Sequence, residues 1–299
     1  MNQIIVIVGP TAMGKTTLSL ELAKKLDGEI ISADSMQFYK GLDIGTAKIK
    51  KEEMEGIKHH LIDILDPSDS FSVAIFQELV REKISLLLSQ KKTPIIVGGS
   101  GLYLQSVLYQ YEFPGVKRSS TEMNCYDCMT NEELMLILTS LNEELAKSVH
   151  LSNRRRLLRS IEIAKSLDQD SYQKGKLPFY ENVILIGLQT SREKMYQLIE
   201  ARVDRMVQNG LIEEARSFYD KKISSQCNMA IGYKELYDYF DESVTQDEAI
   251  ANIKLHSRRY AKRQLTWFKN KMEVNWFEVN LTDFHSTVEE VLQFIEKKV

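Results

Sequence analysis

The chain has no hydrophobic run long enough to cross a lipid bilayer. None of its apolar stretches approaches the roughly 18 consecutive residues that a membrane-spanning helix requires. The first apolar run, Ile4–Val8, begins almost at the N-terminus, without the basic flank and cleavage site of a secretory signal peptide. We therefore expect a protein without a signal peptide and without a membrane partner.

The chain also contains few cysteines. The 3 cysteines among 299 residues fit the reducing environment of the cytoplasm, where we expect the protein to be located. Cys125 and Cys128 form a C-x-x-C motif, but no second Cys or His pair lies near it, and Cys227 stands far along the chain. We interpret the motif as an incidental surface pair rather than a zinc or redox site.

A strong net charge is absent as well, because the formal charge at pH 7 is only −3. Any binding of nucleic acid would therefore depend on a local basic face. Asn153–Arg159 contains four arginines. Ala251–Lys271 contains seven lysines and arginines and no acid, and Tyr260, Trp267 and Phe268 are interleaved among them. These two segments are the candidate basic faces.

The cations of the second segment would repel one another on a helix, where residues three or four apart are neighbours. An anionic partner would relieve that repulsion. Arginine beside aromatic rings suits the phosphates and bases of RNA. The alternative, in which acids elsewhere in the fold pair with these cations, stays open at this point.

A phosphate-binding pattern follows the first apolar run. The pattern G-x-x-x-x-G-K-T consists of Gly9, Pro10, Thr11, Ala12, Met13, Gly14, Lys15 and Thr16. In such a loop the backbone N–H groups surround a diphosphate, the lysine adds positive charge, and the threonine hydroxyl binds Mg²⁺. The helix expected over 15–26 directs its positive dipole end at the same anion. The sequence thus predicts a site for a diphosphate or triphosphate.

The pattern of strands and helices predicts an α/β fold with a parallel sheet and helices on both of its faces. The expected strands are Ile4–Val8, Glu29–Ala33, His59–Leu65, Pro94–Val97 and Asn182–Leu188, with helices over 15–26, 48–55 and 72–90. Residues 116–180 contain only helical segments, expected over 131–138, 143–149 and 154–166. We therefore divide the chain into a phosphate-loop core (1–114 and 181–299) and an inserted helical subdomain (115–180).

The C-terminal half of the core is expected to be helical. Helices are predicted over 191–208, 211–220, 234–240, 247–271 and 287–298, with an edge strand at Val274–Val279.

Two strand ends carry the remaining signals. Asp34 follows the second strand, and ligands bind at the carboxyl ends of strands in open parallel sheets, so Asp34 is expected to face the phosphate site. A role as a turn or cap residue is the alternative. The strand Pro94–Val97 ends in Gly98-Gly99, where a nucleotide hydrolase would carry an acid. Glycines there permit a close approach of backbone or ligand but neither hold a metal nor activate water.

Five stretches in this order resemble the tRNA isopentenyltransferase family, the bacterial tRNA dimethylallyltransferases. They are Gly9–Thr16, Ala33–Gln37, Gly98–Tyr103, Arg155–Arg159 and Tyr260–Trp267, and the resemblance covers nearly the whole chain. It implies transfer of a dimethylallyl group from dimethylallyl diphosphate to N6 of the adenosine 3′-adjacent to the anticodon of tRNA. The products are N6-dimethylallyladenosine and diphosphate.

The resemblance also implies residue roles. Asp34 matches the general base, Lys15 and Thr11 match diphosphate ligands, Arg202 matches an arginine that contacts the diphosphate from the other side, and Thr16 matches the hydroxyl linked to Mg²⁺. The matched tRNA-contacting residues are Asp34, Ser35, Met36, Gln37, Ser100, Arg155, Arg156, Arg159, Lys262, Arg263, Gln264 and Trp267. The implied partners are the tRNA anticodon stem-loop and dimethylallyl diphosphate, the implied cofactor is Mg²⁺, and a monomer is expected. Binding of ATP or another nucleotide in the loop stays open.

Two other functions compete with this one. A small-molecule or nucleotide kinase would place ATP in the loop, use Asp34 as the acid that holds Mg²⁺, and use Arg154–Arg159 as a lid. An RNA-binding NTPase switch without transferase activity is disfavoured because Gly98-Gly99 supplies no hydrolytic group.

Overall fold

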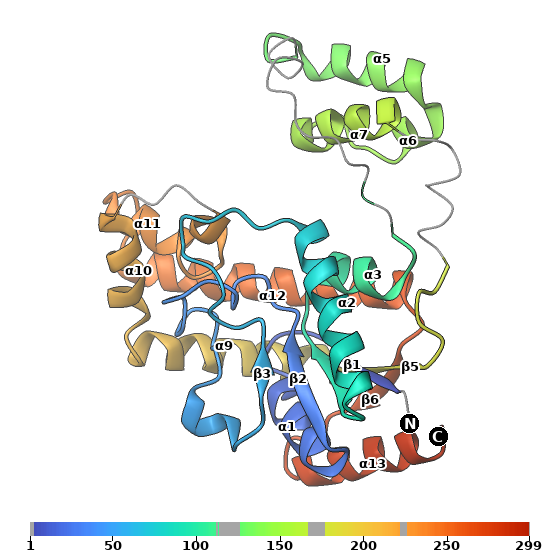
Figure 1. Ribbon diagram of the computed structural model, residues 1–299. Coiled ribbons are helices and arrows are strands. Elements are labelled where there is room, and N and C mark those ends of the chain that lie inside the picture. The colour runs from blue at the N-terminus through green and yellow to red at the C-terminus, as the bar shows by residue number, and fades with distance from the viewer. Residues whose placement is uncertain (1–2, 112, 114–125, 167–176, 222–225, 299) are drawn as a thin grey trace. The chain divides into compact units, whose positions relative to one another are not determined.

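The computed structural model describes residues 3–111, 113, 126–166, 177–221 and 226–298 (Figure 1). The chain forms two compact units, one made of Met1–Val107 with Tyr180–Val299 and the other of Leu108–Phe179. We call them the core unit and the inserted unit. No helix in the described ranges combines the length and the apolar character that crossing a membrane requires.

The core unit is built on a six-stranded sheet with the order β3-β2-β4-β1-β5-β6. Every neighbouring pair in it is parallel. The strands are β1 Ile4–Val8, β2 Gly28–Ser32, β3 His59–His60, β4 Thr93–Val97, β5 Val183–Gln189 and β6 Asn275–Glu278. The predicted parallel sheet is confirmed, and β6 lies at an edge as expected.

β1 lies in the interior of the sheet, between β4 and β5. All five of its residues are buried, which explains its unbroken run of β-branched residues. A strand covered by helices on both faces is apolar on both faces, so it does not alternate with polar residues.

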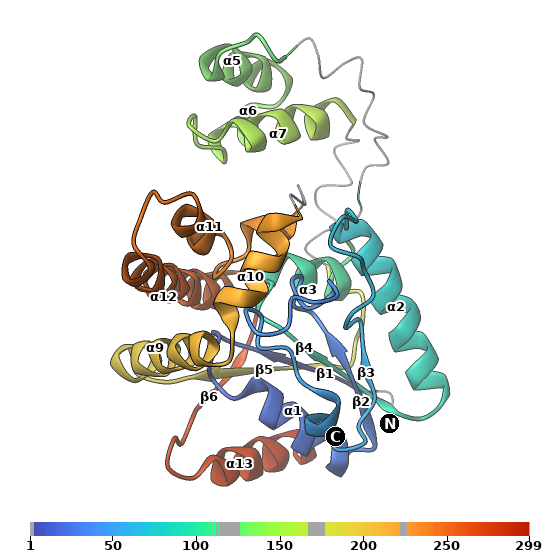
Figure 2. The same ribbon diagram turned by 90° about the vertical axis from the view of Figure 1, so that its left-hand side faces the viewer.

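Helices cover both faces of this sheet. Figure 2 shows α1 and α13 on one face, with α2, α3 and α12 on the other. The helices of the core unit are α1 Lys15–Lys25, α2 Val73–Ser89, α3 Gly101–Leu108, α9 Arg192–Gln208, α10 Leu211–Asp220, α11 Lys234–Phe240, α12 Gln246–Lys271 and α13 Phe284–Glu296. Ser72 caps α2 and Ser191 caps α9, as their positions before the apolar pattern indicate.

The prediction of a strand over 59–65 was wrong in length. β3 ends after two residues, because Leu61 has φ 60° and Asp63 has φ 54°. Non-glycine residues in this left-handed region cannot continue a strand. The helix expected over 48–55 is only the 3₁₀ segment Lys51–Met54, and α3 was not predicted.

The inserted unit is helical, as predicted. Its helices are α5 Asn131–Leu141, α6 Glu143–Lys147 and α7 Arg154–Ser166. They enclose a small core of their own, which includes Leu134, Leu138, Leu157 and Ile161. Cys128 is exposed and Cys227 is buried. Cys125 lies outside the described residues, as does the rest of the segment 114–125, so the C-x-x-C interpretation stays a prediction.

Candidate active site

The predicted site residues follow the carboxyl ends of three neighbouring strands of the core unit. The loop Gly9–Gly14 follows β1, Asp34 follows β2, and Gly98-Gly99 follows β4. The strand order places β4 between the other two. All three strands are parallel, so their carboxyl ends lie side by side at the same end of the sheet (Figure 2).

The phosphate loop has the local geometry that its sequence predicts. Gly14, with φ 79°, precedes the first turn of α1, where backbone N–H groups have no partner within the helix. The positive φ of Gly14 favours glycine, and a Cβ atom here would also displace the Phe284 ring, from which it would lie 2.5 Å away. The Thr16 side chain is exposed at this helix end.

Lys15 folds back over its own loop. Its Nζ donates to the carbonyl of Gly9 at 3.0 Å and to that of Pro10 at 2.6 Å. Burial, reinforced by the positive charge of Arg202, lowers the pKa of Lys15 to about 7, against the opposing effect of Asp34. Lys15, Arg202 and Asp34 therefore interact electrostatically, and the structure brings these three predicted residues together.

One oxygen of Asp34 is used locally. Oδ1 accepts from the backbone N–H of Met36 at 3.0 Å, while the backbone N–H of Asp34 donates to the Ser32 hydroxyl at 3.3 Å. The alternative role of Asp34 as a turn residue is thus correct for this oxygen. Oδ2 accepts no hydrogen bond from any residue in the described ranges, so it can accept a proton or a ligand hydrogen bond.

Arg202 reaches the same place from α9. Its Nη2 donates to the carbonyl of Thr46 at 3.1 Å, and Gln37 Nε2 donates to that carbonyl at 3.4 Å. Burial lowers the pKa of Arg202, and the charge of Asp34 opposes this shift. An arginine in this setting remains a cation and can stabilise negative charge that develops nearby.

Gln264 of α12 joins two of the strand ends. Its Oε1 accepts from the backbone N–H of Thr11 at 3.3 Å, and its Nε2 donates to the carbonyl of Gly99 at 3.1 Å. A Cβ atom on Gly99 would lie 2.0 Å from that Nε2. The close approach expected at Gly98-Gly99 is therefore made by an amide side chain of this protein. Both ends of that amide are engaged within the protein, and its predicted tRNA contact remains a prediction.

Tyr260 belongs to the site, although sequence reasoning treated it only as an aromatic residue between cations. Burial raises the pKa of its hydroxyl to about 12, assisted by the charge of Asp34, and the side chains of Ser100 and Gln264 oppose this shift. The usable signal was its spacing, because residues four apart, such as Tyr260 and Gln264, lie on the same face of a helix. Trp267 packs edge-on against Phe268.

The cations of α12 divide into two groups. Lys254 pairs with Asp204 at 2.6 Å and Arg258 pairs with Glu200, both acids lying on α9. The alternative of acids elsewhere in the fold is thus correct for these two. Arg259, Lys262 and Arg263 are exposed. These exposed cations remain candidates for an anionic partner.

The arginines of α7 divide in the same way within the inserted unit. Arg154 donates to the carbonyls of Tyr126 and Met129, each at 2.6 Å, so it links the start of α7 to the segment before α5. Arg159 pairs with Glu162 at 2.8 Å. Arg155 and Arg156 are exposed.

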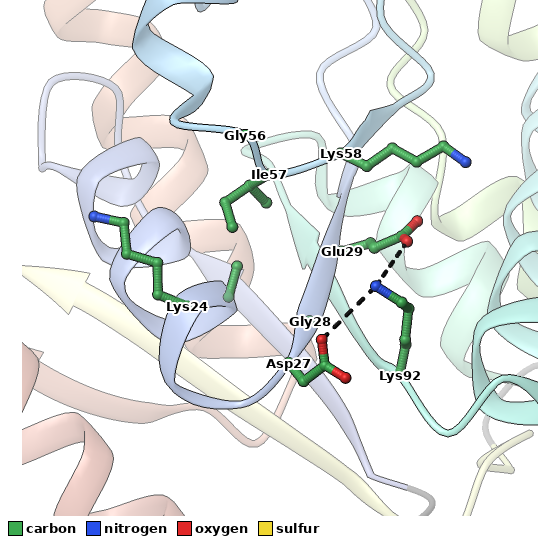
Figure 3. Close-up of a pocket in the computed structure, with 9 residues that line it drawn as sticks. Lys24, Asp27, Gly28, Glu29, Gly56, Ile57, Lys58 and Lys92 are labelled. Carbon is green, nitrogen blue, oxygen red and sulfur yellow. Dashed lines mark ion pairs between the residues drawn. The ribbon is translucent and has the colours of Figure 1, made fainter.

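Among the residues that the structure describes, those with the features of an active site gather at the phosphate-loop end of the sheet. A pocket of about 330 Å³ lies beside the amino end of β2, and its lining includes Lys24, Asp27, Glu29 and Lys92 (Figure 3). Lys92 lies 3.2 Å from Glu29 and 3.7 Å from Asp27, and Lys24 pairs with Glu55 at 2.6 Å. Lys24, Asp27, Glu29 and Lys92 are thus each engaged in an ion pair within the protein.

The phosphate loop offers few oxygen ligands of its own, so it fits a hard cation whose other ligands are the oxygens of a bound phosphate group and water. In the described ranges, no three His, Cys, Asp or Glu side chains gather into a metal cage. Thr16 contributes an exposed hydroxyl oxygen beside the loop. Mg²⁺ typically binds through one or two protein oxygens together with substrate phosphates and water, which is compatible with this donor set.

Comparisons with known proteins agree in one family. Residues 37–271 match the model of the family described as IPP transferase. The chain is 50% identical over 285 residues to a tRNA dimethylallyltransferase of Bacillus subtilis, a match that covers 92% of this chain and 90% of that protein.

Solved structures give the same result. The full-length tRNA isopentenylpyrophosphate transferase of Bacillus halodurans is 44% identical, with a TM-score of 0.78 and coverage of 100% of this chain and 97% of that one. A eukaryotic dimethylallyltransferase acting on tRNA is 26% identical, with a TM-score of 0.87 and coverage of 99% of this chain and 80% of that one.

Proposed function

Because the chain belongs to the IPP transferase family, we propose that it transfers a dimethylallyl group from dimethylallyl diphosphate to tRNA. The acceptor is N6 of the adenosine 3′-adjacent to the anticodon, and the products are N6-dimethylallyladenosine and diphosphate. The tRNA dimethylallyltransferase names of full-length relatives support this reaction. The single observation in the structure that carries it is the convergence of Asp34, Lys15 and Arg202 beside a phosphate loop.

The proposed reaction is one displacement. The C–O bond between the allylic carbon and the diphosphate breaks, and a bond forms between that carbon and N6 of the adenine. The diphosphate leaves with the electron pair of the broken bond. A proton leaves N6 and passes to Asp34, whose Oδ2 is available for it, and a positioned base of this kind contributes about 10²- to 10⁴-fold.

The developing charge on the leaving diphosphate is stabilised from two sides. The N–H groups of the phosphate loop and Lys15 act from one side, and Arg202 acts from the other. Groups that are already in place when the charge develops are often the largest contribution to catalysis. Mg²⁺, when bound at Thr16 and the diphosphate, would supply further positive charge.

The proposed RNA contacts use the exposed cations. Lys262 and Arg263 on α12 lie on the helix that carries Tyr260 and Gln264, and their exposure supports contact with tRNA phosphates. The target adenine has to leave its stack to reach Asp34, which is a form of base flipping. In the inserted unit, Arg155 and Arg156 are the exposed candidates. A protein that acts on tRNA in this way would work in the cytoplasm.

A nucleotide kinase remains the competing activity, since the loop pattern alone also fits a nucleoside triphosphate. Gln264 counts against it. This amide occupies the end of β4, where a hydrolase or kinase of the phosphate-loop type would present an acid to Mg²⁺.

The test measures transfer of labelled dimethylallyl from its diphosphate to an unmodified anticodon stem-loop with Mg²⁺. Asp34→Asn should lower kcat by about 10²- to 10⁴-fold while leaving stem-loop binding intact, because it removes the base but keeps the side-chain shape. Asp27→Asn is the matched control, since Asp27 is exposed and lies at the opposite end of β2. Absence of label with the wild type, together with consumption of ATP, would replace the transferase with the kinase.

A further inference from the structure

The carboxylate of Glu214, in the first turn of α10, holds the backbone of a distant loop. It accepts from the backbone N–H groups of Asp43 at 3.0 Å, Ile44 at 2.8 Å and Gly45 at 2.9 Å. The hydroxyl of Tyr233 also donates to it, at 2.5 Å. Several successive N–H groups converging on one carboxylate make a set of charge-assisted bonds, which are stronger than those between neutral groups. Glu214 therefore fixes this loop in one conformation.

Packing at the loop leaves little room for another conformation. A Cβ atom on Gly45 would lie 2.5 Å from the Tyr233 ring. On the other side, the buried Nζ of Lys48 donates to the carbonyl of Tyr39 at 2.8 Å and to Asp43 at 2.7 Å. We call the segment Leu42–Lys48 the anchored loop.

Thr46, the residue directly after those that Glu214 contacts, is hydrogen-bonded to the active-site residue Arg202. The carbonyl of Thr46 accepts from Arg202 at 3.1 Å and from Gln37 at 3.4 Å. The hydroxyl of Thr46 donates to the carbonyl of Leu42 at 2.6 Å, which orients the peptide at this position. The orientation of one carbonyl thus sets where the Arg202 guanidinium lies.

This placement has a consequence for Asp34. Arg202 and Asp34 attract each other, yet within the described part of the chain they form no direct ion pair. An Arg202 released from Thr46 could turn to Asp34, because a guanidinium binds a carboxylate with two parallel hydrogen bonds. The base would then be occupied, and the leaving group would lose a stabilising cation.

We infer that Glu214 is a positioning residue for the transfer reaction, acting through the anchored loop to keep Arg202 directed at the diphosphate and away from Asp34. The inference rests on the proposed function, and nothing in it requires Glu214 to contact a substrate.

A purely structural role for Glu214 is the alternative, because an acid in the first turn of α10 also stabilises that helix. Glu213 separates the two roles. It lies in the same helical turn with an exposed side chain, so Glu213→Gln removes a first-turn charge without touching the anchored loop. Glu214→Gln keeps the side-chain size but places an NH₂ group against backbone N–H donors.

The experiment measures dimethylallyl transfer, thermal stability and binding of inorganic diphosphate for both variants. Glu214→Gln should lower kcat/KM for dimethylallyl diphosphate by about 10- to 100-fold, since small displacements of a positioned group have effects of this size. Its KM for the stem-loop should stay within about two-fold, and Glu213→Gln should match the wild type. Equal kcat/KM values for the two glutamine variants would overturn the inference.

A double-mutant cycle with Arg202→Gln gives the decisive readout. If Glu214 acts through Arg202, the double variant should be no slower than Arg202→Gln alone. If the two effects multiply, Glu214 acts elsewhere and the inference is wrong.

Should Glu214→Gln fail to fold, Tyr233→Phe takes its place in the cycle, because it removes one donor to Glu214 but keeps the ring against Gly45. Its effect should be about 2- to 5-fold and should also vanish in the Arg202→Gln background. A wild type that transfers no dimethylallyl would refute the proposed function instead. In that case the same double-mutant cycle is measured as the affinity for inorganic diphosphate. If the two substitutions then weaken diphosphate binding independently of each other, the inference is wrong.

Discussion

The phosphate loop and the anchored loop serve the same site but are held in different ways. Lys15 bonds to carbonyls five and six residues before it, so most of the phosphate loop is determined by neighbouring residues. The anchored loop depends on Glu214, which lies 169 to 171 residues further along the chain. The first loop is recognisable as a motif, whereas the second becomes visible only once the chain has folded.

The largest expected effect comes from the locally built loop. Lys15→Met removes a cation from beside the leaving diphosphate, and kcat/KM for transfer should fall by about 10³-fold or more. Lys24→Met is the control, because Lys24 lies on the same helix and pairs at the surface with Glu21 and Glu55. Kinetics with labelled donor check the prediction. A similar decrease in both variants would indicate general damage to α1.

The anchored loop should respond mainly in stability. The Nζ of Lys48 contacts Asp43 at 2.7 Å, Asp63 at 2.6 Å and the carbonyl of Tyr39, and its side chain is 4% exposed. Lys48→Met removes three hydrogen bonds that a buried ammonium group donates, so the free energy of unfolding should fall by about 2 to 3 kcal/mol in urea titrations.

The control for this change is Lys40→Met. The pair Lys40–Asp66, at 3.0 Å, joins two side chains that are both more than half exposed. Exposed pairs contribute at most about 1 kcal/mol. Comparable losses in the two variants would show that Lys48 is no stronger an anchor than a surface lysine.

A smaller effect is expected on α12, where tied and exposed cations lie on one helix. Lys262→Gln should weaken stem-loop binding several-fold and reduce the slope of log K against log salt by about 0.7 to 0.9. Lys254→Gln should change the slope less, because Lys254 already pairs with Asp204. Fluorescence titrations at several salt concentrations check this. Identical slopes in the two variants would contradict the division of α12 into two groups.

The smallest effect is expected at the edge strand β3 and depends on pH. Burial lowers the pKa of His59 and of His60, and Glu29 only partly opposes this for His60. Below their ordinary pKa of about 6.5 the unfolded chain binds more protons than the folded chain, so the free energy of unfolding should decrease as the pH falls from 7 to 5, by about 1 kcal/mol or less in total.

Urea unfolding at pH 7.5 and 5.5 measures this decrease. The double variant His59→Gln/His60→Gln should show a smaller difference between the two pH values. His285→Gln should not, since its side chain is 72% exposed. An unchanged difference in the double variant would assign the pH dependence to other groups.

The contrast between the loops also explains what could be predicted from the sequence. The parallel sheet of the core, the phosphate loop and the position of Asp34 after a strand follow from patterns spanning a few residues. Glu214 could not be found this way, because a glutamate in the first turn of a helix reads as an ordinary helix-stabilising acid. The length of β3 was overestimated because the residue types of Leu61 and Asp63 do not indicate their positive φ.

Which cations are structural could not be predicted from the sequence for a related reason. Arg154 and Arg155 are adjacent in sequence, yet the first donates to three backbone carbonyls and the second is exposed. The difference depends on which face of α7 meets the rest of the unit, and a run of identical residues carries no information about that.

The hydrogen bond between Thr11 and Gln264 has a consequence for protein synthesis. Its partners are 253 residues apart, and α13, whose Phe284 packs on Gly14, comes later still. At roughly 5 to 20 residues per second, the phosphate loop leaves the ribosome on the order of tens of seconds before Gln264 is made. A nascent or prematurely terminated chain therefore carries the phosphate-loop motif without the residue that ties it to β4, and only the finished polypeptide can assemble the complete site.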